Sequence, residues 1–181
     1  MTDYLSLDFE TFSRVNLKKA GLSRYVRDSS TEVLMLAWAL NADDVSLWVP
    51  AEGELMPRRL QELLRDPAIV KRAWNAQFEQ AVFKHVLGME VPAREWRCLM
   101  VLAYSLSLPG ALGKAGEVIG LPQDNKKDSR GKALLRMFSM PRKPTKTLSH
   151  TRVLPHMKPD KWEELKNYCK QDVEAERAIW R

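Results

Sequence analysis

Two acidic residues end the first apolar segment of the chain. Asp8 and Glu10 follow the run Tyr4–Leu7, and side chains two positions apart in a strand point to the same face. Like charges held side by side resist joint ionisation, so such a pair becomes favourable when it binds a hard cation such as Mg²⁺ or Mn²⁺. Acidic pairs at strand ends are mostly solvated, so the prediction of a metal site depends on the rest of the chain.

A third acid, Glu79, begins an expected helix. The segment Asn75-Ala76-Gln77-Phe78-Glu79 directly follows an expected strand, which places Glu79 near the carboxyl end of that strand, where α/β sites usually form. The structural alternative is that Glu79 complements the helix dipole and that Asn75 caps the helix.

A tyrosine and a fourth acid share one face of the last expected helix. Tyr168 and Asp172 are four residues apart, so both point the same way at the edge of the helix's apolar stripe. They could face a cleft beside the core. The alternative is a half-buried tyrosine beside a solvated aspartate.

The positive charge of the chain is concentrated in one segment. Residues 126–161 hold eleven Lys or Arg and two acids, a net charge of +9, whereas the whole chain carries +6. A basic stretch near an acidic pocket is typical of a protein that holds a polyanion by its phosphates. The alternative is a solvated surface.

Length and composition limit the class of protein. The 181 residues fit a single domain, 1–181, with no apolar run long enough to span a membrane. The N-terminus lacks the form of a secretory signal, and Cys98 and Cys169 are too few for a disulfide framework. We therefore expect a cytoplasmic protein that does not enter a membrane.

The elements that must position these residues form a mixed α/β pattern. Expected strands cover 4–9, 33–40, 45–49, 69–74 and 95–98. Expected helices cover 55–64, 76–86, 99–104, 112–119, 129–138 and 161–181, and 140–159 is an irregular loop. Antiparallel strands followed by alternating helices and strands predict a mixed five-stranded sheet flanked by helices.

Together the motifs resemble those of the DEDD 3′–5′ exonucleases, which have an RNase H-like fold. Asp8-x-Glu10 is similar to their first motif, Asn75-x-x-x-Glu79 to the second and Tyr168-x-x-x-Asp172 to the third. The tyrosine indicates the tyrosine branch, since Asn167 stands where the other branch has histidine. Leu7–Ser13, Leu17–Gly21 and Pro141–Lys146 further resemble the proofreading domain of phage-encoded family A DNA polymerases.

The resemblance implies two-metal hydrolysis of phosphodiesters, with two Mg²⁺ or Mn²⁺ ions roughly 3.5–4 Å apart. Asp8 would bridge both ions, Glu10 and Asp172 would complete the site that activates water, and Glu79 would support the second ion. Tyr168 would orient the water. The product would be a 5′-mononucleotide from the 3′ end of single-stranded DNA. The family's second motif usually ends in Asp, and Glu79 moves that carboxylate by about one bond length.

Six further residues are candidates for binding the nucleic acid. They are Thr11, Phe12, Asn75, Lys143, Lys146 and Arg152. Phe12 could stack on a base or belong to the core, and the three basic residues could hold phosphates or remain solvated. If they hold phosphates, neutralising all three should flatten the salt dependence of binding.

Two alternatives remain open. One is an RNA-trimming exoribonuclease of the same fold, because contacts to a 2′-hydroxyl cannot be identified from sequence. The other is a non-catalytic nucleic-acid-binding module, which Glu79 alone favours. The resemblance also implies a DNA polymerase as a partner, in the same chain or in another, and the host cytoplasm as the location if the protein is phage-encoded.

Overall fold

The structure of the protein is a computed structural model that describes residues 2–121, 125–144 and 151–180. Its strands are β1 (Tyr4–Phe12), β2 (Glu32–Leu40), β3 (Ser46–Trp48), β4 (Val70–Ala73) and β5 (Trp96–Cys98). Its α-helices are α1 (Leu17–Ala20), α2 (Leu22–Arg27), α3 (Arg58–Arg65), α4 (Ala76–His85), α5 (Leu99–Ser105), α6 (Leu112–Val118), α7 (Asn125–Ser139) and α8 (Pro159–Trp180). Short 3₁₀ helices are η1 (Pro50–Glu52), η2 (Ala93–Glu95) and η3 (Pro155–Met157).

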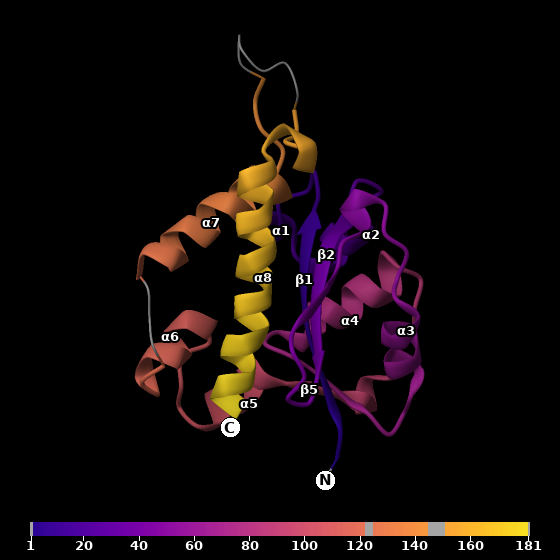
Figure 1. Cartoon of the computed structure of the whole chain (residues 1–181), viewed down its shortest axis with the longest axis vertical. Coiled ribbons are helices and arrows are strands. Elements are labelled where there is room, and N and C mark those ends of the chain that lie inside the picture. Colours follow the sequence, from indigo (N-terminus) through magenta and orange to yellow (C-terminus); the bar gives the residue numbers. More distant parts are fainter. Residues whose placement is uncertain (1, 122–124, 145–150, 181) are drawn as a thin grey trace.

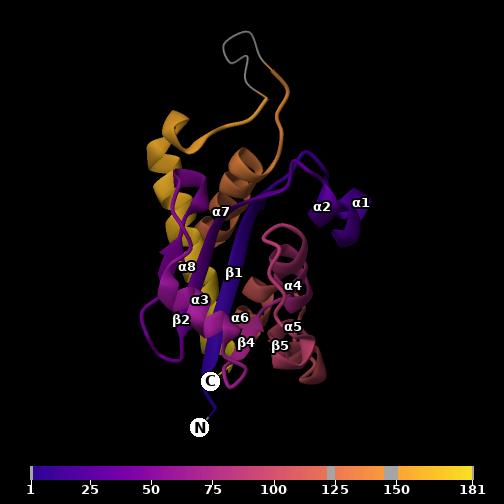
Figure 2. The ribbon, with the colours of Figure 1, turned by 90° about the vertical axis from the view of Figure 1, so that its right-hand side faces the viewer.

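The five strands form one mixed sheet in the order β3-β2-β1-β4-β5. The central strand β1 is antiparallel to β2 and parallel to β4, and β5 is parallel to β4. The predicted mixed five-stranded sheet flanked by helices is therefore confirmed. Figure 1 shows α7 and α8 on one side of the sheet and α2 and α4 on the other, and Figure 2 shows the same layers from the side.

The side chains of β1 alternate between the two faces of the sheet, which places its apolar residues on one face and its acids on the other. Leu5, Leu7 and Phe9 are buried in the hydrophobic cluster that α2, α3 and α4 complete. Asp8 and Glu10 lie between them in sequence and so point to the opposite face, where α7 and α8 pack. A second cluster covers that face, and it includes Phe12, Phe138, Trp162 and Leu165.

The end of β1 that carries Asp8 and Glu10 extends beyond β4, its parallel neighbour. β4 pairs with β1 only from Tyr4 to Ser6, whereas β1 continues to Phe12. A register shift between Glu10 and Thr11 also leaves Leu34 of β2 without a paired residue. Bulges of this kind redirect side chains next to functional sites. Asp8 and Glu10 are thus presented at the carboxyl end of β4, where α4 begins.

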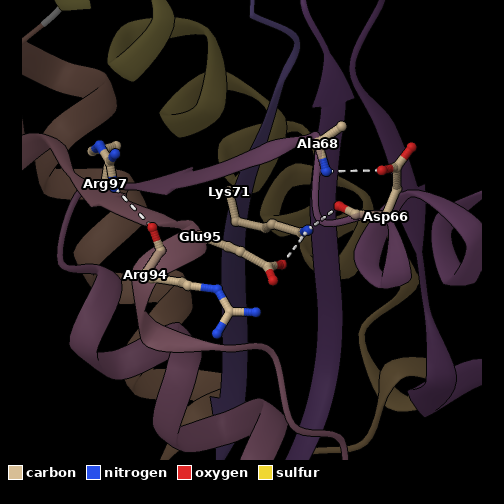
Figure 3. Close-up of polar contacts among 6 residues, drawn as sticks. All are labelled: Asp66, Ala68, Lys71, Arg94, Glu95 and Arg97. Atoms are coloured by element: carbon tan, nitrogen blue, oxygen red, sulfur yellow. Dashed lines mark hydrogen bonds and ion pairs between the residues drawn. The ribbon is translucent and has the colours of Figure 1, made fainter.

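A buried ion pair joins β4 to η2, the short helix directly before β5. Lys71 is fully buried, and its Nζ donates to Glu95 Oε2 at 2.9 Å and to the carbonyl of Asp66 at 2.7 Å (Figure 3). Removal of one partner of such a pair leaves an uncompensated buried charge. Lys71 therefore holds the sheet edge that precedes the candidate site.

The expected helices and strands are present, with changes at their ends. Helix α3 begins at Arg58 rather than 55, and β1 extends three residues further than expected. The short helices α1 and α2 were not predicted from the sequence. In the expected loop 140–159, the structure leaves 145–150 undescribed and contains η3. Among the described residues, no helix is both long and apolar enough to cross a membrane.

Candidate active site

Asp8, Glu10 and Cys169 meet where β1 passes α8. Their ligand atoms all lie within 4.8 Å of one another. The Cys169 thiol donates to Asp8 Oδ2 at 3.6 Å. Burial raises the pKa of Cys169, and the charges of Asp8 and Glu10 raise it further, so the thiol stays protonated. Cys169 therefore serves as a neutral donor to Asp8, and hard cations would select the oxygens instead.

The position of Glu79 agrees with the strand-to-helix geometry expected from the sequence. It is only 4% exposed in the first turn of α4, and its Oε2 is buried with no hydrogen-bond partner among the described residues. Burial raises the pKa of Glu79 well above its usual range, and the Asp8 carboxylate adds to this effect. Glu79 and Asp8 therefore act on each other across the end of β4.

Asp172 and Tyr168 reach the same group of acids from α8. Burial raises the pKa of Glu10, as do the charges of Asp8, Asp172 and Glu79. Burial also raises the pKa of Tyr168, as do the charges of Asp172, Glu10 and Asp8, and the Tyr168 hydroxyl hydrogen-bonds to Asp172. The five predicted active-site residues thus converge from β1, α4 and α8.

The negative charge of the site has little compensation within the described part of the chain. No salt bridge among the described residues includes Asp8, Glu10 or Glu79. Buried carboxylates without partners are unfavourable unless they are protonated or bind a cation. Oxygen ligands, several carboxylates and the orphaned Oε2 of Glu79 fit a divalent cation such as Mg²⁺ or Mn²⁺.

A fifth acid of the site, Glu176, was missed by sequence reasoning. It lies one turn after Asp172 on α8 and is fully buried. Burial raises the pKa of Glu176, followed in importance by the charges of Asp8 and Glu79. Its spacing of four residues from Asp172 would have placed it on the correct helix face.

The predicted substrate-binding residues are more dispersed. Thr11 is buried and shares a 2.8 Å hydrogen bond with the hydroxyl of Tyr25. Asn75 is exposed at the start of α4 and makes no capping hydrogen bond with its side chain. Lys143 is exposed, and Lys146 lies outside the described residues.

Phe12 and Arg152 lie together in a basic pocket. Phe12 is 5% exposed and packs in the core, and the Arg152 guanidinium lies 3.9 Å from the centre of its ring and pairs with Glu32. A cavity of about 480 Å³ opens beside them. The cavity is lined by Phe12, Arg14, Ser29, Ser30, Glu32, Pro141, Arg142, Thr151 and Arg152.

Comparison with solved structures identifies the fold. Trypanosoma brucei RNase D, in complex with RNA U12, has a TM-score of 0.60 and 15% identity over 97% of this chain and 54% of that one. Escherichia coli RNase D, an exoribonuclease involved in structured RNA processing, has a TM-score of 0.51 and 20% identity over 97% and 40% of the two chains. The RNase H-like α/β fold of these nucleases is thus confirmed for this chain.

Sequence comparison adds one particular relative. A DNA polymerase of Bacillus phage SP02 is 44% identical over 177 residues, which are 97% of this chain and 27% of the polymerase. The chain thus spans about a quarter of the length of that curated relative. No protein-family model matches the chain.

Proposed function

We propose that residues 1–181 form one metal-dependent 3′–5′ exonuclease domain of the DEDD tyrosine branch. It hydrolyses the terminal phosphodiester of single-stranded DNA and releases 5′-mononucleotides. The observation that carries the proposal is the convergence of Asp8, Glu10, Glu79 and Asp172 beside Tyr168, where several of them raise one another's pKa.

Two divalent cations, Mg²⁺ or Mn²⁺, are the cofactors of this proposal. Asp8, Glu10, Glu79 and Asp172 would hold them, and the charge of Asp8 acts on Glu10, Glu79 and Tyr168 alike. When bound, the cations supply Lewis-acid activation of water and neutralise the charge that develops on the phosphodiester.

The remaining chemistry belongs to the side chains. Tyr168 has its pKa raised, so it stays protonated at neutral pH and cannot act as a base. A protonated phenol held by Asp172 can orient the attacking water through its hydroxyl oxygen. Cys169 holds the Asp8 carboxylate in place through its thiol.

Residues at the end of β1 and the start of α4 would bind the substrate. The exposed amide of Asn75 is available to a phosphate or a sugar. Phe12 lines the pocket at the end of β1 and would meet the nucleic acid there, whereas the buried Thr11 would support that strand end through its hydrogen bond with Tyr25. The pocket of Arg14, Arg142 and Arg152 supplies positive charge for phosphates further along the strand, with Lys143 and Lys146 on the neighbouring loop.

DNA is favoured as the substrate because the 44% identical relative is a DNA polymerase. Its name also supports proofreading as the role, a polymerase in the same chain or in another as the partner, and the host cytoplasm as the location. An RNA substrate, as bound by the RNase D with a similar fold, is the alternative outcome of the test.

The test is digestion of matched DNA and RNA oligonucleotides, labelled at the 5′ end, with Mg²⁺ or Mn²⁺. Successive shortening from the 3′ end is expected, faster for DNA, and EDTA or the Asp8→Ala substitution should abolish it. Faster digestion of the RNA would reassign the substrate. Full-length product with either cation would overturn the nuclease proposal and leave a binding module.

A further inference from the structure

Glu176 has one oxygen engaged and the other free. Its Oε1 accepts a hydrogen bond from the backbone N–H of Trp74 at 2.9 Å. Its Oε2 is buried and has no hydrogen-bond partner in the described part of the chain. The side chain is 0% exposed, so bulk solvent does not reach the second oxygen.

The hydrogen bond from Trp74 ties α8 to the point where β4 becomes α4. Trp74 directly follows β4 and precedes the helix that carries Glu79. Its carbonyl accepts from the N–H of Met100 at 3.1 Å, and its indole N–H donates to the carbonyl of Gly110 at 2.8 Å. Glu176 is therefore the link that fixes this junction relative to Asp172, one turn earlier on α8.

Among the residues that the structure describes, none serves as a counter-ion to Glu176. Asp8, Glu79 and Asp172 are the charged groups that act on it, and all three are acids. Arg177 on the next helix position pairs with Glu174 at 3.3 Å. The guanidinium of Arg72 on β4 lies over the rings of Tyr4 and Trp180, 3.1 and 4.4 Å from their centres.

We propose that Glu176 is a positioning residue of the cation site, which holds the Glu79 junction against α8 and supplies a fifth negative charge that increases affinity for the divalent cation on the Glu79 side. This inference rests on the proposed function. A neutral glutamine would accept the same hydrogen bond from Trp74, so the hydrogen bond alone does not account for an acid. A buried cation near its free oxygen does account for it.

The test compares Glu176→Gln with the wild-type chain by thermal unfolding and by titration of Mn²⁺, followed by electron paramagnetic resonance. Without cations the variant should unfold at a higher temperature, because glutamine avoids the cost of burying an ionisable carboxyl without a counter-ion. With Mn²⁺ its stabilisation should be smaller, and its weaker Mn²⁺ site should lose affinity by roughly tenfold or more, as for other residues that support metal ligands.

Two further variants separate charge from structure. Glu174→Gln removes an exposed acid from the same helix and should leave Mn²⁺ affinity unchanged. Glu176→Ala removes the hydrogen bond as well, so it should lose thermal stability without cations relative to Glu176→Gln. Equal Mn²⁺ affinity in wild type and Glu176→Gln would overturn this inference alone, whereas a wild-type chain that binds no Mn²⁺ would overturn the proposed function as well.

Discussion

The backbone of Gly131 on α7 lies directly against the ring of Tyr168. A Cβ atom built on Gly131 would lie 2.1 Å from Cε2 of that ring, far closer than two carbon atoms can approach. The Tyr168 ring can therefore pack against the backbone of α7 only because position 131 is glycine. The position of the Tyr168 hydroxyl beside Asp172 depends on this contact.

Gly131→Ala should therefore reduce activity more than it reduces stability. The added methyl group must displace the Tyr168 ring, and a misplacement of about 1 Å can lower the rate about a hundredfold. Measurement of kcat and of the thermal unfolding temperature checks this. In a Tyr168→Ala background the same substitution should have no further effect on kcat; an equal loss in both backgrounds would show that the glycine acts elsewhere.

Metal-free stability should fall as pH rises. Burial raises the pKa of Asp8 from 3.8 to about 7, and the pKa values of Glu10 and Glu79 also rise. The folded protein then binds more protons than the unfolded one. The stability that protonated Asp8 contributes is therefore fully present below about pH 4 and is lost as the pH rises through about 7.

Thermal unfolding in EDTA between pH 5.5 and pH 8 measures this loss. The unfolding temperature of the wild type should fall more steeply than that of Asp8→Asn, which cannot ionise at that position, and saturating Mn²⁺ should remove most of the difference. Parallel curves for the two proteins in EDTA would refute the assignment of a raised pKa to Asp8.

The basic pocket should contribute to strand binding through charge. Replacing Arg14 and Arg142 with alanine should weaken binding of single-stranded DNA and reduce the slope of log K against log salt by about 1.4, or about 0.7 for each phosphate that is no longer neutralised. Fluorescence anisotropy at several salt concentrations measures the slope. Arg58→Ala with Arg65→Ala, on α3, removes the same charge from another surface and should leave the slope unchanged.

The buried pair of Lys71 and Glu95 should dominate the stability of the β4–β5 edge. Glu95→Gln leaves the Lys71 ammonium buried without its counter-ion and should destabilise the fold by about 3–5 kcal/mol. The exposed pair of Arg58 and Glu62, at 2.8 Å, is the control, and Glu62→Gln should cost no more than about 0.5 kcal/mol. Similar midpoints of urea unfolding for the two variants would contradict this ranking.

The sequence predicted those parts of the site that depend on local strand and helix geometry, and not those that depend on tertiary packing. The shared face of Asp8 and Glu10 and the shared face of Tyr168 and Asp172 depend only on strand and helix periodicity, so both pairs were predictable. Glu79 was placed by the strand-to-helix junction. Its approach to Asp8 depends on the early end of β4, which is a tertiary feature.

Other features had no local signal. Helices α1 and α2 span four and six residues, and α1 buries none of its side chains, so periodicity could not reveal them. Lys71 interrupts its strand pattern with a charge whose counter-ion, Glu95, comes 24 residues later. Glu176 matched the spacing of the third motif, but its burial depends on the packing of α8 over the end of β4.

The central claim is that Asp8, Glu10, Glu79 and Asp172 together hold divalent cations. Anomalous scattering from a crystal soaked in Mn²⁺ with a 5′-mononucleotide tests it most directly. Two manganese peaks bounded by these four carboxylates, with the nucleotide phosphate between them and Tyr168, are the predicted result. Saturating Mn²⁺ with no peak among them, or with Asp172 turned away from Asp8, would contradict the account.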